Sequence, residues 1–142
     1  RPVKLGWVDY AAWDDVMHVN TMSPLKVTEC FLENVAASDL KKIISITSKM
    51  GSIADNEAGG SYIYRSSKAA LNAVMKSLSV DLSPRGISVA MLHPGWVRTD
   101  MGGPSGLIDA EESVSGMRRV IDGLTLETSG RMLNYDGAEI PW

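Results

Sequence analysis

Apolar side chains recur every three or four residues between position 11 and about position 37, a spacing that predicts one long helix with a wide apolar face. Asp9 is a suitable N-cap for a helix that begins near Tyr10. Pro24 lies inside this helix, and because proline has no N–H, the carbonyl of Asn20 loses its helical donor. The sequence therefore predicts a kink at Asn20. The freed carbonyl is either a polar site that recruits another donor, often water, or part of a solvated kink without function.

Three short runs of apolar and β-branched residues predict strands, which lie at 43–47, 87–92 and 131–135. Two further helices are predicted between them, over 61–82 and 109–124. The chain thus alternates helix and strand three times, and its strands are apolar enough to be covered on both faces. This order indicates an α/β fold with a parallel sheet and right-handed crossovers.

Composition limits the classes of function. The chain has 142 residues, 44% of them hydrophobic, which suits a single globular domain with a core. Its formal net charge is −3 and its basic residues form no cluster beyond short pairs, so nucleic acid is not an expected partner.

Cys30 is the only cysteine, which excludes an internal disulfide and a multi-thiolate metal site and suits a reducing compartment. Its helical position predicts a small buried side chain. No apolar run approaches the roughly 20 residues that cross a bilayer, so we expect a cytoplasmic protein without a membrane partner. The start at Arg1, without methionine, suggests that residues are missing upstream.

Tyr64 and Lys68 are the first candidates for chemistry. Four residues apart on a helix, their side chains share one face. An ammonium beside a phenol favours the phenolate, so such a tyrosine could exchange a proton with a substrate oxygen near neutral pH. Alone, however, this spacing occurs by chance in many helices.

Two more polar residues converge on this pair. Asn20 lies in the kinked helix, and Ser48 follows the strand predicted at 43–47. Because parallel strands end at one edge of a sheet, Asn20, Ser48, Tyr64 and Lys68 can all reach that edge.

This arrangement resembles the short-chain dehydrogenase/reductase family, whose tetrad is Asn, Ser, Tyr and Lys, the last two spaced Tyr-x-x-x-Lys. Other family motifs follow in the family's order: Trp13 with Val19-Asn20-Thr21, then 46–51, 64–72, Asp81-Leu82 and 93–103. The stretch His-Pro-Gly-Trp-Val-Arg-Thr-Asp-Met-Gly-Gly and the Pro141-Trp142 pair are most similar to the carbonyl reductases related to sniffer and to the C-factor proteins.

The resemblance implies a role for each member of the tetrad. Tyr64 would be the general acid when a carbonyl is reduced and the base when an alcohol is oxidised. Ser48 would hydrogen-bond the reacting oxygen. Lys68 would favour the phenolate and hold the nicotinamide ribose. Asn20 would hold a water through its main-chain carbonyl and so connect Lys68 to solvent.

The same resemblance implies a nicotinamide cofactor. Tyr64 and Lys68 would contact it, and four residues of the 93–103 stretch would border the nicotinamide: Pro94, Gly95, Val97 and Thr99. NADP is favoured over NAD by the resemblance alone. The implied substrate is a small carbonyl compound or alcohol. The long helices would pair in a homodimer or homotetramer, where the small side chains of Ser66, Ala70 and Ala73 would permit close approach.

One part of the family pattern is absent. No two glycines are separated by a single residue, so neither GxGxxG nor the family's TGxxxGxG turn occurs. We therefore expect residues 1–142 to be the C-terminal catalytic portion of a single Rossmann-like domain. It would hold three strands and three main helices of the doubly wound sheet, without the N-terminal strands and the glycine-rich half.

Two functional hypotheses follow. The first is a fragment of an NAD(P)H-dependent carbonyl reductase or alcohol dehydrogenase, inactive unless the missing half is present. The alternative is a truncated, non-catalytic family member that acts in signalling or protein interaction. His18 and His93 have no metal-ligand partners at suitable spacing, so no metal site is predicted.

Overall fold

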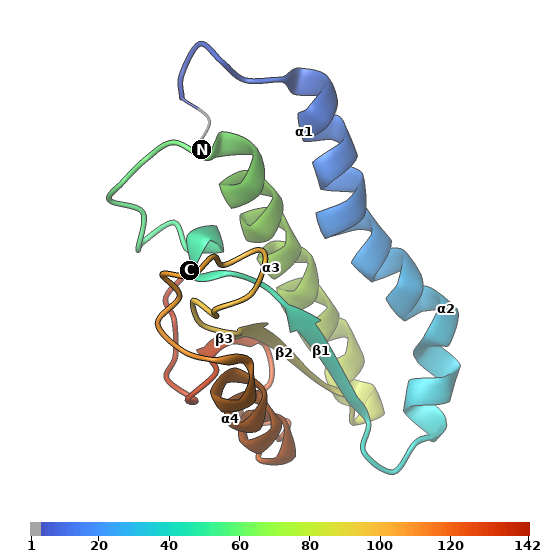
Figure 1. The fold of residues 1–142 in the computed structure, drawn as a ribbon. Helices are drawn as coiled ribbons and strands as arrows, with labels where there is room; N and C mark the ends of the chain where they lie inside the picture. Colours follow the sequence, from blue (N-terminus) through green and yellow to red (C-terminus); the bar gives the residue numbers. More distant parts are fainter. Residues whose placement is uncertain (1–3) are drawn as a thin grey trace.

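The computed structural model describes residues 4–142, whose strands form a parallel sheet with helices on both faces (Figure 1). Within this range the sheet has three strands in the order β1-β2-β3: Lys42–Ile46, Ser88–His93 and Arg131–Asn134. Ile44 lies opposite Ala90, and Leu92 lies opposite Leu133. The predicted α/β class and parallel sheet are confirmed, with strand ends within one residue of prediction.

The long helix predicted from the apolar spacing has three parts: α1 at Tyr10–Met17, a π-helical turn at His18–Met22 and α2 at Ser23–Ala37. Asp9 caps α1 as predicted, since its carboxylate accepts the N–H of Ala12 at 3.1 Å. In the π turn the N–H of Ser23 donates to the carbonyl of His18, five residues earlier. Because Pro24 cannot donate, the regular α pattern is interrupted where the sequence predicts, at Asn20.

The remaining helices are α3, Tyr62–Leu82, and α4, Ala110–Asp122. The chain enters α3 through three successive residues with positive φ: Gly59, Gly60 and Ser61. At the other end of the domain, Nζ of Lys42 donates to the carbonyls of Ile121 at 2.6 Å and Asp122 at 3.0 Å. A cation is favourable at a helix C-terminus, so this contact fixes the end of α4 to β1.

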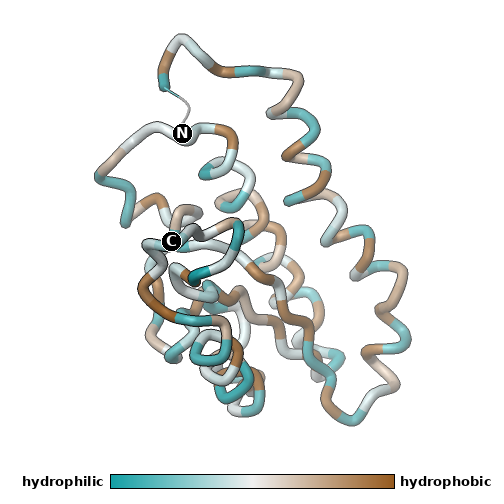
Figure 2. Tube along the Cα trace, viewed as in Figure 1, coloured by the Kyte–Doolittle hydropathy of each residue, from teal (hydrophilic) through white to brown (hydrophobic). Residues whose placement is uncertain are grey.

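Alternate residues of the strands build two cores, because successive side chains point to opposite faces of a sheet. Val89 and Met91 of β2 face α3 and α2, in a core that includes Leu71 and Met75 of α3. Ala90 and Leu92 face α4. The hydrophobic colouring of the strands in Figure 2 agrees with a sheet covered on both sides.

The apolar face of α1 and α2 is only partly covered. Leu32, Val35 and Ala36 pack on the core, whereas Val19, Val27 and Phe31 are 66%, 57% and 59% exposed. One part of the wide apolar face thus packs on the sheet, and no other described residue covers the rest of it. The prediction that Cys30 is buried is wrong, because its position on α2 faces away from the sheet and its side chain is exposed.

Strand β1 is an edge of the sheet within residues 4–142, and its last residue, Ile46, is 49% exposed. No helix in this part of the chain is both long and apolar enough to span a membrane. The carboxyl ends of β1 and β2, which carry Ser48 and Pro94, lie side by side.

Candidate active site

Lys68 lies beside Tyr64 on α3. Its Nζ is 5.9 Å from the centroid of the Tyr64 ring and donates to the carbonyl of Ile46, at the end of β1, at 3.2 Å. Burial lowers the pKa of Lys68 below its usual range, because desolvation disfavours the charged ammonium. The phenol and a lysine that releases its proton more readily than usual therefore share one end of the sheet.

Ser48 begins a short 3₁₀ turn, Lys49–Gly51, directly after β1. Its Oγ accepts the N–H of Met50 at 3.1 Å, and this bond leaves the hydroxyl hydrogen free to donate elsewhere. The turn packs on α3 next to Lys68: a Cβ added to Gly51 would lie 2.9 Å from the carbonyl carbon of Lys68. Glycine at position 51 thus lets the Ser48 turn approach the helix of Tyr64 and Lys68.

Asn20 reaches the same helix from the π turn. Its side-chain amide donates to Oγ of Ser67 at 3.1 Å, and the hydroxyl of the neighbouring Thr21 donates to the carbonyl of Ser67 at 3.0 Å. Ser67 directly precedes Lys68, so the π turn is held against the α3 segment that carries the candidate pair. The carbonyl of Asn20, implicated by the resemblance as a water ligand, stays a prediction.

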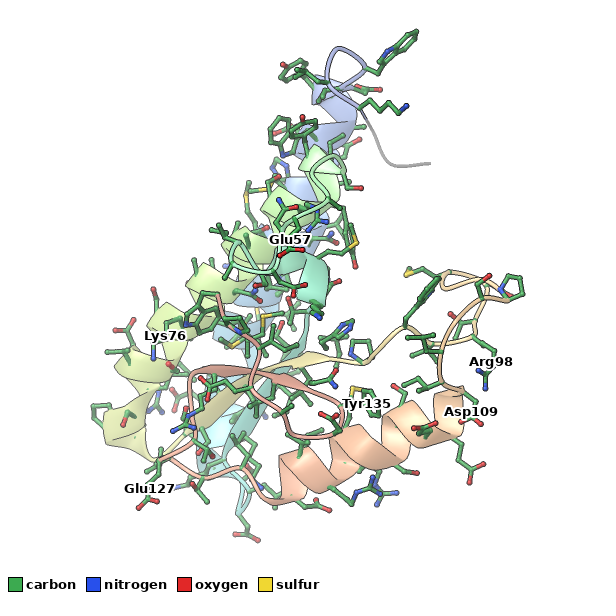
Figure 3. All side chains as sticks on the ribbon, turned by 90° about the vertical axis from the view of Figure 1, so that its left-hand side faces the viewer. Glu57, Lys76, Arg98, Asp109, Glu127 and Tyr135 are labelled. Atoms are coloured by element: carbon green, nitrogen blue, oxygen red, sulfur yellow. The ribbon has the colours of Figure 1, made fainter. Side chains whose placement is uncertain are left out.

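The Pro94–Gly95 turn follows β2 at the same sheet edge. The hydroxyl of Ser113, on α4, donates to the carbonyl of Pro94 at 2.5 Å. Gly95 has φ +86, and a Cβ there would come within 2.7 Å of Ile108 and 3.0 Å of the Tyr135 ring. Figure 3 shows Tyr135 between the sheet and α4, where its ring packs against Gly95 of the turn. Glycine is required at this position for both its conformation and its close packing.

The loop from 96 to 108 closes on itself beyond that turn. Val97 forms a parallel bridge with Ile108. In this bridge the N–H of Arg98 donates to the carbonyl of Ile108, and the N–H of Ile108 donates to the carbonyl of Trp96. The bridge therefore does not use the N–H and carbonyl of Val97 itself. Oγ of Thr99 accepts the N–H of Gly102 at 3.2 Å and keeps its own hydrogen available. In Figure 3 the loop projects from the body between Arg98 and Asp109.

These groups fit one end of a nicotinamide cofactor. A carboxamide needs both a donor and an acceptor; the Val97 N–H and the Thr99 hydroxyl can donate to it, whereas the Val97 carbonyl packs against Gly102. The glycine-rich turn that would hold the pyrophosphate does not occur in this sequence. Residues 4–142 contain no cluster of metal-ligating side chains.

Two surface hollows lie along α4, one lined by Arg119, Gly123 and Leu133 and one by Asp109 and Glu112. None of the four candidate catalytic residues lines either hollow. The candidate site lies instead at the carboxyl edge of β1 and β2.

Sequence reasoning missed three residues near the site. Asn72 accepts the hydroxyl of Thr47 at 2.7 Å in a buried contact that joins α3 to the end of β1. Its place four residues after Lys68, on the same helical face, was a usable signal. Thr21 and Ser52 carried no such signal, because their partners are backbone carbonyls distant in sequence.

His93, at the end of β2, is a half-buried residue near the candidate site with one buried ring nitrogen. Its Nδ1 is inaccessible and has no hydrogen-bond partner among the described residues. Burial and then the charge of Lys49 lower its pKa, against a smaller opposing effect of Asp55. Lys49 and Asp55 themselves form an ion pair of 3.3 Å.

We expect His93 to make the full-length protein less stable in mild acid. As pH falls through the unfolded pKa of about 6.5, the unfolded chain takes up a proton before folded His93 does, so the free energy of unfolding decreases from about that pH downward. His93→Gln removes the titration and should show a smaller decrease. Urea unfolding of both proteins on either side of this pH measures the difference. Equal losses would contradict the prediction.

The chain was compared with known proteins. Residues 3–107 match the family described as short chain dehydrogenase. C-signal of Myxococcus xanthus is 50% identical over 138 residues, covering 97% of this chain and 83% of that protein. The 1-hydroxy-2-glutathionyl-2-methyl-3-butene dehydrogenase of Rhodococcus sp. (strain AD45) is 40% identical over 145 residues, covering 98% and 62%.

Solved structures give the same result. The carbonyl reductase Sniffer of D. melanogaster superposes with a TM-score of 0.94 at 37% identity, and an NADPH-bound carbonyl reductase from chicken fatty liver with 0.91 at 33%. Both comparisons cover 100% of this chain and 62% of the other. Apart from C-signal, the chain therefore spans about three fifths of the relatives named here. The sequence match and the shared fold together establish that the chain belongs to the short-chain dehydrogenase/reductase family.

Proposed function

We propose that the protein containing this chain reduces a carbonyl group, or oxidises the corresponding alcohol, with NAD(P)(H), and that Tyr64 transfers the proton. The observation that carries the proposal is the half-buried Lys68, whose Nζ lies 5.9 Å from the Tyr64 ring centroid and is anchored on Ile46. Lys68 thus places a proton-bearing amine beside the phenol, where the pair can take part in proton transfer with a substrate oxygen.

The other candidate residues support this chemistry from neighbouring elements. Ser48 can donate its hydroxyl hydrogen to the reacting oxygen, because in its bond with Met50 the Oγ of Ser48 is only an acceptor. Asn20 holds the π turn against Ser67, next to Lys68, where its carbonyl could fix a water that exchanges protons with Lys68.

The cofactor, when bound, supplies or accepts the hydride. Pro94, Gly95, Val97 and Thr99 would border the nicotinamide, and Tyr64 and Lys68 would contact it as well. NADP is the favoured form, since the similar carbonyl reductase structure from chicken fatty liver contains NADPH. We propose that the rest of the dinucleotide is held by a glycine-rich half, encoded upstream, of the same Rossmann-like domain, of which residues 1–142 are the C-terminal catalytic portion.

The test uses the full-length protein with NADPH and a panel of small aldehydes, ketones and alcohols. We expect substrate-dependent oxidation of NADPH, followed by its absorbance. A protein that binds NADPH but turns over no member of the panel would contradict the reduction of small carbonyl compounds. A protein that binds neither NADPH nor NADH would contradict the proposal.

A second candidate is a signalling or protein-interaction function. It is favoured by the name of C-signal, at 50% identity, and by the uncovered apolar side chains of α1 and α2. Absence of nicotinamide binding by the full-length protein, with retained binding of a protein partner, would favour this candidate over the reductase.

Self-association is part of the proposal, since members of this family commonly oligomerise. The outer face of α2 carries Val27 and Phe31, and Val19 of the π turn is exposed as well; two copies of this helix could bury these side chains against each other. We expect Phe31→Glu to shift the full-length protein to a smaller species in analytical ultracentrifugation. Leu126→Glu, also at an exposed apolar residue but after α4, is the control. An unchanged distribution for Phe31→Glu would exclude this interface.

We also expect a cytoplasmic location, which fractionation of cells tests.

A further inference from the structure

The last residues of the chain return to the loop that follows Ser48. After β3, Ile140 donates its N–H to the carbonyl of Met132 at 2.8 Å and is buried in the core. The next two residues reach residues 52–54, and Figure 1 shows the C-terminus beside that loop. The hydroxyl of Ser52 donates to the carbonyl of Pro141 at 2.6 Å, and the N–H of Ala54 donates to the carbonyl of Trp142 at 2.8 Å.

Ser52 is the centre of this contact. It is 2% exposed, and its N–H donates to the carbonyl of Lys49 at 2.9 Å, inside the turn that Ser48 begins. Its Oγ also accepts the N–H of Asp55 at 3.1 Å. One buried side chain thus joins the chain end, the 52–55 loop and the Ser48 turn.

The Ser48 turn has two supports. On α3, the close approach of Gly51 to the backbone of Lys68 sets the distance between turn and helix. Through Ser52, the turn is tied to Pro141, and through Ile140 to strand β3. A short turn held only by its own Ser48–Met50 and Ser48–Gly51 bonds could shift, whereas one tied at both ends is fixed.

We propose that residues 141–142 form a strap that fixes the Ser48 turn through Ser52, and that Ser52 is a positioning residue for the reaction. The strap sets where the Ser48 hydroxyl lies relative to Tyr64, because displacement of a catalytic group by about 1 Å can cost about 100-fold in rate. The inference rests on the function proposed for Ser48. The mechanical effect of the strap on the turn does not depend on that function.

The experiment compares Ser52→Ala with the wild type in the full-length protein. Hydrogen exchange at the amides of Met50 and Gly51 measures whether the turn has loosened, and we expect exchange at least about fivefold faster in the variant. We expect kcat for carbonyl reduction to fall about tenfold while the dissociation constant of NADPH is unchanged, since Ser52 touches no proposed cofactor residue. Ser79→Ala, which removes another buried serine hydroxyl at the far end of α3, should change neither quantity.

A second pair of variants separates the strap's backbone from its side chain. Ala54→Pro removes the N–H that donates to the carbonyl of Trp142 and should reproduce the effect of Ser52→Ala. Trp142→Ala keeps the carbonyl and should preserve exchange and kcat. This pair also covers the case in which Ser52→Ala does not fold.

Unchanged exchange at Met50 and Gly51 in both Ser52→Ala and Ala54→Pro would overturn the strap. Faster exchange with unchanged kcat would overturn the positioning role of Ser52. Failure of the proposed function is recognised separately: Tyr64→Phe would then retain full turnover, whatever the exchange of the Ser48 turn shows.

Discussion

Replacing Tyr64 by phenylalanine is expected to lower kcat of the full-length protein by about 10²–10⁴-fold, the range in which loss of a general acid or base falls. The substitution removes one hydroxyl and keeps the ring, so Lys68 retains its anchor on Ile46 and the packing of α3 is preserved. NADPH binding should be largely unchanged, because the substitution removes only one of the proposed cofactor contacts and leaves those of Lys68 and of the loop at Pro94–Thr99. Steady-state kinetics and cofactor titration on the same preparation measure both quantities.

Tyr62 provides a matched control on the same helix. It begins α3 and is 38% exposed, and no role is proposed for it. Tyr62→Phe should therefore leave kcat within about twofold of the wild type, since a surface hydroxyl contributes little to a distant reaction. Substantial turnover by Tyr64→Phe would refute the assignment of the proton donor, and a similar loss in both variants would indicate an indirect effect on α3.

The fold was largely predictable from local sequence patterns. Asp9 and Asp109 both cap helices, and Pro24 marks the place where the α pattern of the first helix breaks. Each of these signals acts within a few residues of its own position, through a side-chain acceptor or a missing N–H. The three strands are rich in apolar residues because helices cover both faces of the sheet.

What the sequence could not give is contact between distant segments. A free cysteine at a helical position predicts a buried side chain, yet Cys30 lies on the exposed face of α2. Ser52 looked like an ordinary loop residue, but its hydroxyl binds the carbonyl of Pro141, 89 residues away. Backbone acceptors leave no trace in residue identity, so such contacts are visible only in the structure.

The arrangement of the candidate catalytic residues was only partly predictable from the sequence. Tyr64 and Lys68 share one helix, so their proximity follows from helical spacing. Their relation to Ser48 depends on how closely the Lys49–Gly51 turn approaches α3, which no local pattern determines. Gly51 controls that approach.

Replacing Gly51 by alanine is expected to force the Ser48 turn away from α3. The added methyl would lie 2.9 Å from both the carbonyl carbon and Cβ of Lys68, and 3.1 Å from the N atom of Ala69. These atoms belong to the middle of a helix and cannot move independently, so the turn must shift. We expect a loss of about 1–3 kcal/mol in the free energy of unfolding, as for other overpacked sites.

The same shift should reduce catalysis more than stability alone explains. Because the Ser48 hydroxyl moves with the turn while Tyr64 stays on the helix, we expect kcat to fall about 10–100-fold in conditions where the variant is fully folded. Gly123→Ala is the control, since its added Cβ would meet its nearest neighbour, the carbonyl oxygen of Arg119, at an ordinary 3.5 Å. If Gly51→Ala is destabilised but retains its kcat, the Ser48 hydroxyl does not need this distance from α3. If kcat falls and exchange at Met50 rises together, the close contact of turn and helix is what brings serine and tyrosine to one substrate oxygen.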